Sequence, residues 1–237
     1  ALRRRKAVAR QAQVSRFLPQ HHWEQVRATI EMLPGNTPRL AKRAARFRWL
    51  FSLLYIGGLR LSEVCNHSME DFYSRRGADG RDRWWLEICG KGHKTRLVPA
   101  TDELMSELMR YRRANQLTPL PRAGENLPLL IPSIGVARPM ARSAVHELVK
   151  EIFRETATRL RALGTDQEAV ATQLERVSAH WIRHTSGTHQ SNNMDLKAVR
   201  DNLGHANIAT TSIYVHTEDD SRHDQTSNGH RIDWSFL

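Results

Sequence analysis

The spacing of apolar residues predicts a largely helical chain. A first helix is expected from Pro19 to about Met32, where the turn-forming sequence LPGNTP ends it. The next helix carries apolar side chains at steps of three and four, namely Leu40, Ala44, Phe47, Leu50, Phe51 and Leu54. Gly57 and Gly58 then interrupt the pattern, and a third helix is expected to begin near Arg60.

The middle of the chain follows a different period. The sequences WWLEIC at 84–89 and RLVPA at 96–100 are separated by turn residues, which predicts a β-hairpin. A helix is expected to start at Thr101, and the proline-rich stretch 117–133 reads as a long connection. Further helices are expected at 145–163, 166–176, 181–191, 195–203 and 207–215, before a polar tail. The expected fold class is therefore mainly α with a small antiparallel β-hairpin or sheet (α+β).

The charge of the chain indicates its class of partner. Thirty-six Lys and Arg residues stand against 25 Asp and Glu, and apart from RRRK at 3–6 the basic residues are spread along the sequence. A folded surface with a net charge of +11 attracts polyanions, which favours nucleic acid over the alternative of a merely soluble basic domain. Cys65 and Cys89 lie in apolar-patterned segments typical of buried free thiols, so no disulfide is expected.

Two further stretches set limits on the fold. Residues 1–16 carry few large apolar side chains at any helical period, which predicts a basic linker or a frayed helix. The longest uncharged apolar run, residues 49–59, has roughly half of the ~20 residues that a membrane-spanning helix needs. We therefore expect a soluble protein with no membrane partner.

The segment SAHWIRHTSGTH at 178–189 raises the question of a metal site. His180 and His184 are four residues apart and would share one helix face. Zinc proteases place a Glu between two such histidines, whereas Trp, Ile and Arg183 stand here, and the arginine would repel a dication. We therefore expect no metal. From this segment alone, histidines that simply pack in a helical bundle remain an open alternative.

Four motifs in order change this interpretation. They are GGLRLSEV at 57–64, GKGHKTRLVP at 90–99, HWIRHTSGTH at 180–189 and LGHANIATTSIYVHT at 203–217. Together they resemble the tyrosine recombinase (phage integrase) family, and within it the catalytic domains of Xer-type bacterial integrases. The resemblance covers about 200 residues, from the first helix to the last motif, and it implies the tyrosine recombinase catalytic fold.

The resemblance implies a role for each matching position. The implied catalytic residues are Arg60, Lys91, His180, Arg183, His205 and Tyr214, with Tyr214 as the nucleophile. Glu63 and His184 would support the site from behind, and His189 would pack in the core or behind the site. The implied DNA contacts are His93, Lys94 and Arg96, of which Lys94 and Arg96 also compete with Lys91 for the role of general acid.

The chemistry of these residue types agrees with the implied roles. Arg60 and Arg183 can hold the negative charge that gathers on a phosphodiester under attack. A tyrosine hydroxyl needs help to ionise at neutral pH, and His180 can take its proton. Lys91 would protonate the leaving 5′-oxygen, and His205 would donate to a phosphate oxygen. The covalent 3′-phosphotyrosine keeps the bond energy, so strand exchange needs no metal, ATP or other cofactor.

The expected organisation follows the family. Residues 1–16 would be the remnant of an interdomain linker after a missing core-binding domain, residues 17–216 the catalytic domain, and residues 217–237 a tail. Trp234, Phe236 and Leu237 in this tail either dock on a neighbouring protomer or fold back on their own chain.

The partner is expected to be double-stranded DNA in the bacterial cytoplasm, at the nucleoid. The protein would form a homotetramer on DNA and a monomer in isolation. Two alternatives are a non-catalytic DNA-binding module of the same fold and a type IB topoisomerase or telomere resolvase. The expected biological setting, such as a phage or another mobile genetic element, is left open.

Overall fold

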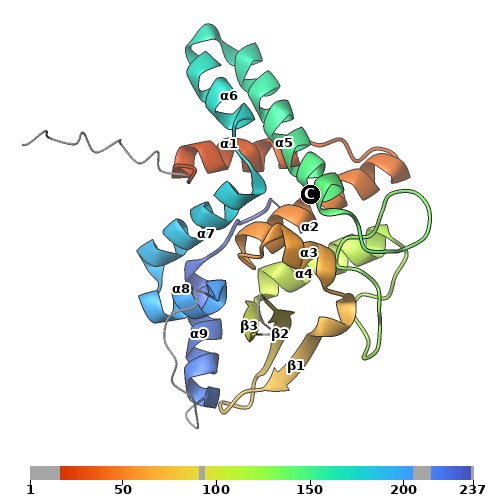
Figure 1. The fold of residues 1–237 in the computed structure, drawn as a ribbon, viewed down its shortest axis with the longest axis vertical. Coiled ribbons are helices and arrows are strands. Elements are labelled where there is room, and N and C mark those ends of the chain that lie inside the picture. The colour runs from red at the N-terminus through yellow and green to blue at the C-terminus, as the bar shows by residue number, and fades with distance from the viewer. Residues whose placement is uncertain (1–16, 91–93, 205–214, 236–237) are drawn as a thin grey trace, which may run out of the picture.

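The computed structural model describes residues 17–90, 94–204 and 215–235, which form a helical body with a small antiparallel sheet at one end (Figure 1). The strands are β1 (Phe72–Arg76), β2 (Asp82–Cys89) and β3 (Thr95–Ala100). The helices before the long connection are α1 (Gln20–Glu31), α2 (Pro38–Tyr55), α3 (Leu61–Asn66), the 3-10 turn η1 (Met69–Asp71) and α4 (Asp102–Ala114). Those after it are α5 (Arg142–Leu163), the 3-10 turn η2 (Thr165–Gln167), α6 (Glu168–Glu175), α7 (Ala179–Asn193), α8 (Leu196–Leu203) and α9 (Val215–Gly229). The expected α+β class is confirmed.

Helix α2 is the centre of the core. Pro38 occupies its first turn, and the Thr37 side chain accepts a hydrogen bond from the Leu40 amide at 3.3 Å, so these two residues fix the helix start. From residue 45 to residue 55 every side chain is buried, including Arg48. A buried guanidinium needs a partner, and Glu107 on α4 supplies a two-bond ion pair at 2.8 and 3.0 Å.

The sheet holds one strand more than the predicted hairpin. The order is β1-β2-β3, antiparallel throughout, and Trp85 in the middle strand pairs with Tyr73 on one side and Pro99 on the other. Strand β1 escaped prediction because FYSRR is short and its alternation is weak. The Trp85 ring is fully buried beneath α9, where its centroid lies 5.2 Å from that of His223.

Helices α5 and α6 form a hairpin at the end of the molecule opposite the sheet (Figure 1). The 22-residue α5 buries one face in the core, and the short α6 packs back on its second half. Arg161 joins the two helices through ion pairs with Glu168 and Glu175 at 3.0 and 2.6 Å.

The described part of the C-terminal tail packs on its own chain. Residues 219–229 belong to α9, so the expected polar tail is helical and the expected boundary at 216–217 falls inside this helix. The Trp234 side chain is only 5% exposed, and its indole Nε1 donates to Ser52 Oγ at 3.0 Å while Arg48 stacks 4.7 Å above the ring. Phe236 and Leu237 lie outside the described residues.

Two remaining expectations concern cysteines and membranes. Both cysteines are free thiols, as predicted, and Cys65 is buried. Cys89 is exposed, contrary to expectation, because it ends β2 on the face that points away from the core. Within the described ranges, no helix combines the length and apolar character that crossing a membrane requires.

Removing the Trp234 ring should destabilise the whole domain. We expect Trp234→Ala to lower the free energy of unfolding by about 3 kcal/mol, since it empties a buried aromatic site. Urea denaturation measures this value. The control is Leu163→Ala. Leu163 is 67% exposed, so this substitution should lower the free energy of unfolding only slightly. A loss below about 1 kcal/mol for Trp234→Ala would show that the tail does not pack as described.

Candidate active site

Residues from distant parts of the chain meet at a cleft between α3, α7 and α8. Arg60, His180, Arg183 and His184 line a hollow of about 410 Å³, whose other wall is α8. An adjoining hollow of about 330 Å³ shares the first three of these residues and extends to Arg142 at the start of α5. Three of the residues predicted to be catalytic are therefore brought together by the fold.

The turn before α3 shapes the floor of this cleft. Gly58 has a φ of +56°, a left-handed conformation that favours glycine, and a Cβ there would lie 2.7 Å from Leu203 Cδ2. The Gly57–Gly58 pair therefore lets α8 approach the turn closely. It also directs the Gly58 carbonyl toward Arg183, which donates a hydrogen bond to it. Arg60 stands two residues after Gly58 and is the N-cap residue of α3.

Glu63 holds two arginines together behind the cleft. The Glu63 side chain is 4% exposed and accepts hydrogen bonds from the Arg60 amide at 2.7 Å and from Arg60 Nη1 at 2.8 Å. Arg96 on β3 approaches from the other side with two bonds of 2.8 Å each. Burial alone would raise the pKa of this carboxyl group, but the hydrogen bonds and charges of Arg96 and Arg60 outweigh it and lower the pKa to about 2.

Arg183 carries its charge into the same cleft from α7. The residue is 6% exposed, and its guanidinium donates to the carbonyl oxygens of Gly58 and Leu203. Burial lowers its pKa to about 9, and the like charges of Arg60 and Arg96 add to this effect while Glu63 opposes it. Arg183 thus stays protonated at neutral pH. Both hydrogen-bond partners found among the described residues are uncharged carbonyls, which leaves its charge available for an anion.

His180 and His184 form a pair on the exposed side of α7. Their Nε2 atoms are 2.7 Å apart, and their ring centroids are 4.3 Å apart. At this distance one ring donates a hydrogen bond and the other accepts it. Two imidazolium ions could not form this bond, because both Nε2 atoms would carry a proton and neither could accept. At least one of the two histidines is therefore neutral in this arrangement, and a neutral imidazole can act as a base.

The third histidine of the segment has a different environment. His189 is buried, and its Nδ1 lies 2.7 Å from the Tyr55 hydroxyl oxygen in the core. Burial lowers the pKa of its ring, so it is neutral at physiological pH. The core position expected for His189 is confirmed.

Arg96 is used differently from the sequence expectation. It was expected to contact a DNA phosphate, yet its side chain is 10% exposed, and besides Glu63 it binds the Asn202 carbonyl oxygen at 3.0 Å. Arg96 is therefore a positioning residue that links β3 and α8 to the carboxylate behind Arg60. No local sequence signal marks this role, since it depends on a strand and a helix that meet only in the fold.

Of the remaining predicted site residues, the structure describes only Lys94. Lys94 is exposed at the end of the hairpin loop, where its carbonyl oxygen accepts from the Gly90 amide at 2.9 Å. The other four, Lys91, His93, His205 and Tyr214, lie outside the described residues, so their roles stay predictions. In the part of the chain that the structure covers, no group of three or more His, Cys, Asp or Glu side chains is arranged to hold a metal ion.

The comparison with protein families assigns the class. The model of the phage integrase family matches residues 17–221. The chain therefore belongs to the phage integrase family, as its motifs predict.

Curated relatives within this family include the tyrosine recombinase XerD of Rhizobium meliloti (strain 1021). It is 30% identical over 206 residues, which are 86% of this chain and 57% of the relative. The tyrosine recombinase XerD of Rickettsia prowazekii (strain Madrid E) is 29% identical over 195 residues, 81% of this chain and again 57% of the relative. The chain thus spans somewhat more than half the length of these relatives.

Solved structures share the fold at lower identity. The XerH site-specific recombinase bound to difH substrate has a TM-score of 0.55 and 20% identity, over 88% of this chain and 49% of that one. The integrase from mycobacterium phage Brujita has a TM-score of 0.53 and 18% identity, over 90% and 59% of the two chains. These likenesses confirm the catalytic fold of the family.

The charge on Glu63 should stabilise the protein in a pH-dependent way. Its folded pKa of about 2 lies below the ordinary 4.5, so its contribution is complete above pH 4.5 and is lost as the pH falls toward 2. The shift corresponds to roughly 3 kcal/mol. We expect Glu63→Gln to be less stable than the parent by about that amount at neutral pH, and the gap to close near pH 2.

Denaturant unfolding at a series of pH values measures this gap. The control is Glu147→Gln, which removes an exposed carboxylate from an exposed ion pair. A gap that stays constant from neutral to acid pH would contradict the assigned ionisation of Glu63.

Proposed function

We propose that this chain is the catalytic domain of a tyrosine-type site-specific DNA recombinase or integrase, which cuts and rejoins DNA strands through a covalent 3′-phosphotyrosine. The observation that carries the proposal is the meeting of Arg60 and Arg183 in one cleft beside His180. Their shared position suits a group with negative charge, and the phosphate of a DNA backbone is such a group.

In the proposed cleavage step the nucleophile loses one proton and the leaving group gains one. The Tyr214 hydroxyl oxygen attacks the scissile phosphorus and gives its proton to His180. The bond between phosphorus and the 5′-oxygen breaks, and Lys91 gives a proton to that oxygen. Arg60, Arg183 and His205 stabilise the charge on the non-bridging oxygens during the transfer. In the second step a 5′-hydroxyl from another strand attacks the phosphotyrosine, and the same groups run the transfer in reverse.

The proposed setting follows from the same chemistry. The partner is double-stranded DNA in the bacterial cytoplasm, at the nucleoid, and four copies of the chain act together on two DNA duplexes. A monomer is proposed for the chain without DNA. The formal charge of +11 supports DNA as the partner, since such a surface attracts a polyanion. Residues 17–216 are the proposed catalytic part, residues 1–16 a proposed basic linker, and residues 217–237 the tail.

The covalent intermediate gives a direct test. The protein is incubated with a library of nicked duplexes of randomised sequence in excess EDTA, and adducts that survive denaturant are captured and sequenced. We expect adducts that share a DNA sequence, and none with Tyr214→Phe. Binding of DNA without any adduct would identify a non-catalytic DNA-binding module instead. Adducts that persist in Tyr214→Phe would contradict the assigned nucleophile.

The half-exposed Arg60 allows a quantitative test of the cleft. With a duplex selected from the library, we expect Arg60→Ala to slow adduct formation by about 100-fold, because one charged donor to the phosphate is lost. The matched control is Arg231→Ala, which removes an arginine of similar exposure that pairs with Asp233. Equal rates for the two variants would show that Arg60 has no special place in the reaction.

A further inference from the structure

The attachment of α9 raises a question about the residue that precedes it. Tyr214, the proposed nucleophile, is followed at once by Val215, the first residue of α9. None of the described side chains of this helix, at residues 219–229, is apolar. Among the side chains of α9 that the structure describes, the buried ones are all polar, namely Asp220, Arg222, His223 and Thr226. Besides the contact of His223 and Arg222 with the Trp85 ring, charge and hydrogen bonds therefore hold the described part of the helix.

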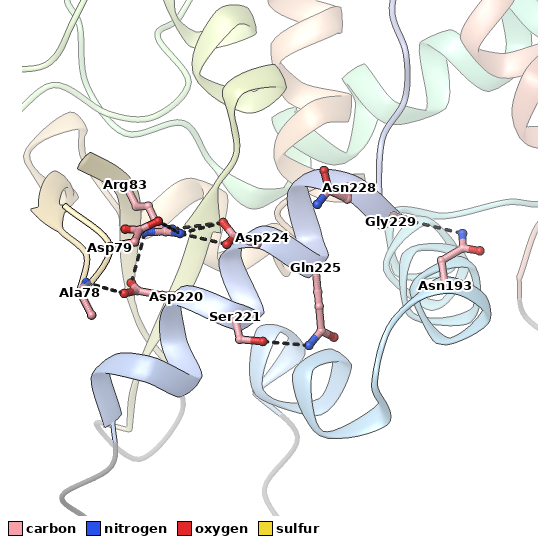
Figure 2. A pocket seen from close by; sticks show the side chains of 10 residues that line it. All are labelled: Ala78, Asp79, Arg83, Asn193, Asp220, Ser221, Asp224, Gln225, Asn228 and Gly229. Atoms are coloured by element: carbon pink, nitrogen blue, oxygen red, sulfur yellow. Dashed lines mark hydrogen bonds and ion pairs between the residues drawn. The ribbon is translucent and has the colours of Figure 1, made fainter. Parts of the chain in front are cut away.

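A buried arginine on β2 provides the main attachment. The Arg83 side chain is only 5% exposed and forms ion pairs in two directions (Figure 2). Toward the β1–β2 turn it meets both oxygens of Asp79, at 2.7 and 3.0 Å. Toward α9 its Nη2 meets both oxygens of Asp224, at 3.0 and 2.9 Å, and its Nη1 lies 3.8 Å from Asp220.

The β1–β2 turn also binds α9 directly. A carboxylate oxygen of Asp220 accepts a hydrogen bond from the Ala78 amide at 2.9 Å, as Figure 2 shows. Asp79, Arg83, Asp220 and Asp224 together are called the Arg83 clamp below. The clamp joins the turn, the middle strand and the helix through one guanidinium.

A second set of contacts connects α9 to the site behind Arg60. Arg222 donates to the Leu97 carbonyl oxygen on β3 at 2.8 Å and to Asn202 Oδ1 at the end of α8 at 3.2 Å. Arg96, one residue before Leu97, holds Glu63 and the Asn202 carbonyl oxygen. Strand β3 and the end of α8 therefore contact both α9 and the carboxylate that supports Arg60.

Losing the partners of Arg83 should release the helix. An unpaired guanidinium in a buried place is strongly unfavourable, so the chain would move to hydrate it. The movement available is separation of α9 from the turn, because those two elements supply the carboxylates. The residue whose position would change with the start of α9 is Tyr214.

We propose that the Arg83 clamp is a positioning device for the nucleophile: it fixes the start of α9, and with it Tyr214, relative to the Arg60–Glu63–Arg96 cluster. This inference rests on the proposed function, in which Tyr214 attacks the scissile phosphate. We propose the clamp residues as positioning residues, not as catalytic ones. They act through the helix.

The test separates positioning from general stability. In the variant Asp79→Asn/Asp224→Asn, the two exposed carboxylates of the clamp become neutral. The matched control is Glu125→Gln, which weakens the two-bond ion pair of the buried Arg112, at 2.8 and 3.0 Å, in the long connection and away from α9. Adduct formation is timed at saturating protein on a selected duplex, and the dissociation constant for the same duplex is measured separately.

We expect the clamp variant to form adduct about tenfold more slowly, with little change in the dissociation constant, because a small displacement of a reacting group has a large effect on rate. The control should keep the parental rate even if its stability falls. Arg83→Lys, which keeps the charge, should retain a larger share of the rate than the clamp variant. A clamp variant that cleaves as fast as the control would overturn the proposal.

Hydrogen exchange on the protein without DNA tests the structural half independently. Peptides from residues 205–224 should exchange faster in the clamp variant than in the parent, while peptides from α7 should be unchanged. Unaltered exchange in 205–224 would overturn the proposal. Failure of the parent protein to form any adduct would instead reject the proposed function, and the two failures are therefore distinguishable.

Discussion

The carboxylate of Glu63 is the interaction on which the site depends. A cleft that binds a phosphate needs several guanidinium groups close together, and like charges in a partly buried place repel each other. Glu63 offsets this repulsion because its two carboxylate oxygens accept hydrogen bonds from both arginines. Arg96 donates through its guanidinium, and Arg60 donates through its backbone amide and its guanidinium. The lowered pKa of Glu63 keeps the negative charge in place at any physiological pH. Arg183 donates to two carbonyl oxygens, so its positive charge remains available to an anion.

The fold brings separate elements to this carboxylate. Arg60 is the N-cap residue of helix α3, and Glu63 lies in its first turn. Strand β3 supplies Arg96, and α7 supplies Arg183. The end of α8 joins them, since its carbonyl oxygens at Asn202 and Leu203 receive Arg96 and Arg183. Helix α8 leads into the segment that contains His205 and Tyr214. The charges that we propose to bind a phosphate therefore also fix the place where the proposed nucleophile segment begins.

Local patterns predicted the parts of this structure that depend on local physics. Periodicity and caps placed most helices, because burial of one face repeats every three or four residues, and the motifs placed Arg60, Glu63, His180 and Arg183 in one site. The inward role of Arg96 and the attachment of α9 were not predictable. Both depend on ion pairs between residues far apart in the sequence, such as Arg83 with Asp224. Such pairs produce no periodic pattern in the sequence from which they could be predicted. Strand β1 was missed because its five residues show little alternation.

We propose that Arg60 and Arg183 neutralise the charge of a phosphate. The most direct measurement uses a selected duplex in which a neutral methylphosphonate replaces the scissile phosphate. Adduct formation is timed for the parent and for Arg60→Ala on both substrates. We expect the loss of about 100-fold on the phosphate to shrink to less than about tenfold on the methylphosphonate, since the charge that Arg60 meets is gone. An equal loss on both substrates would contradict it.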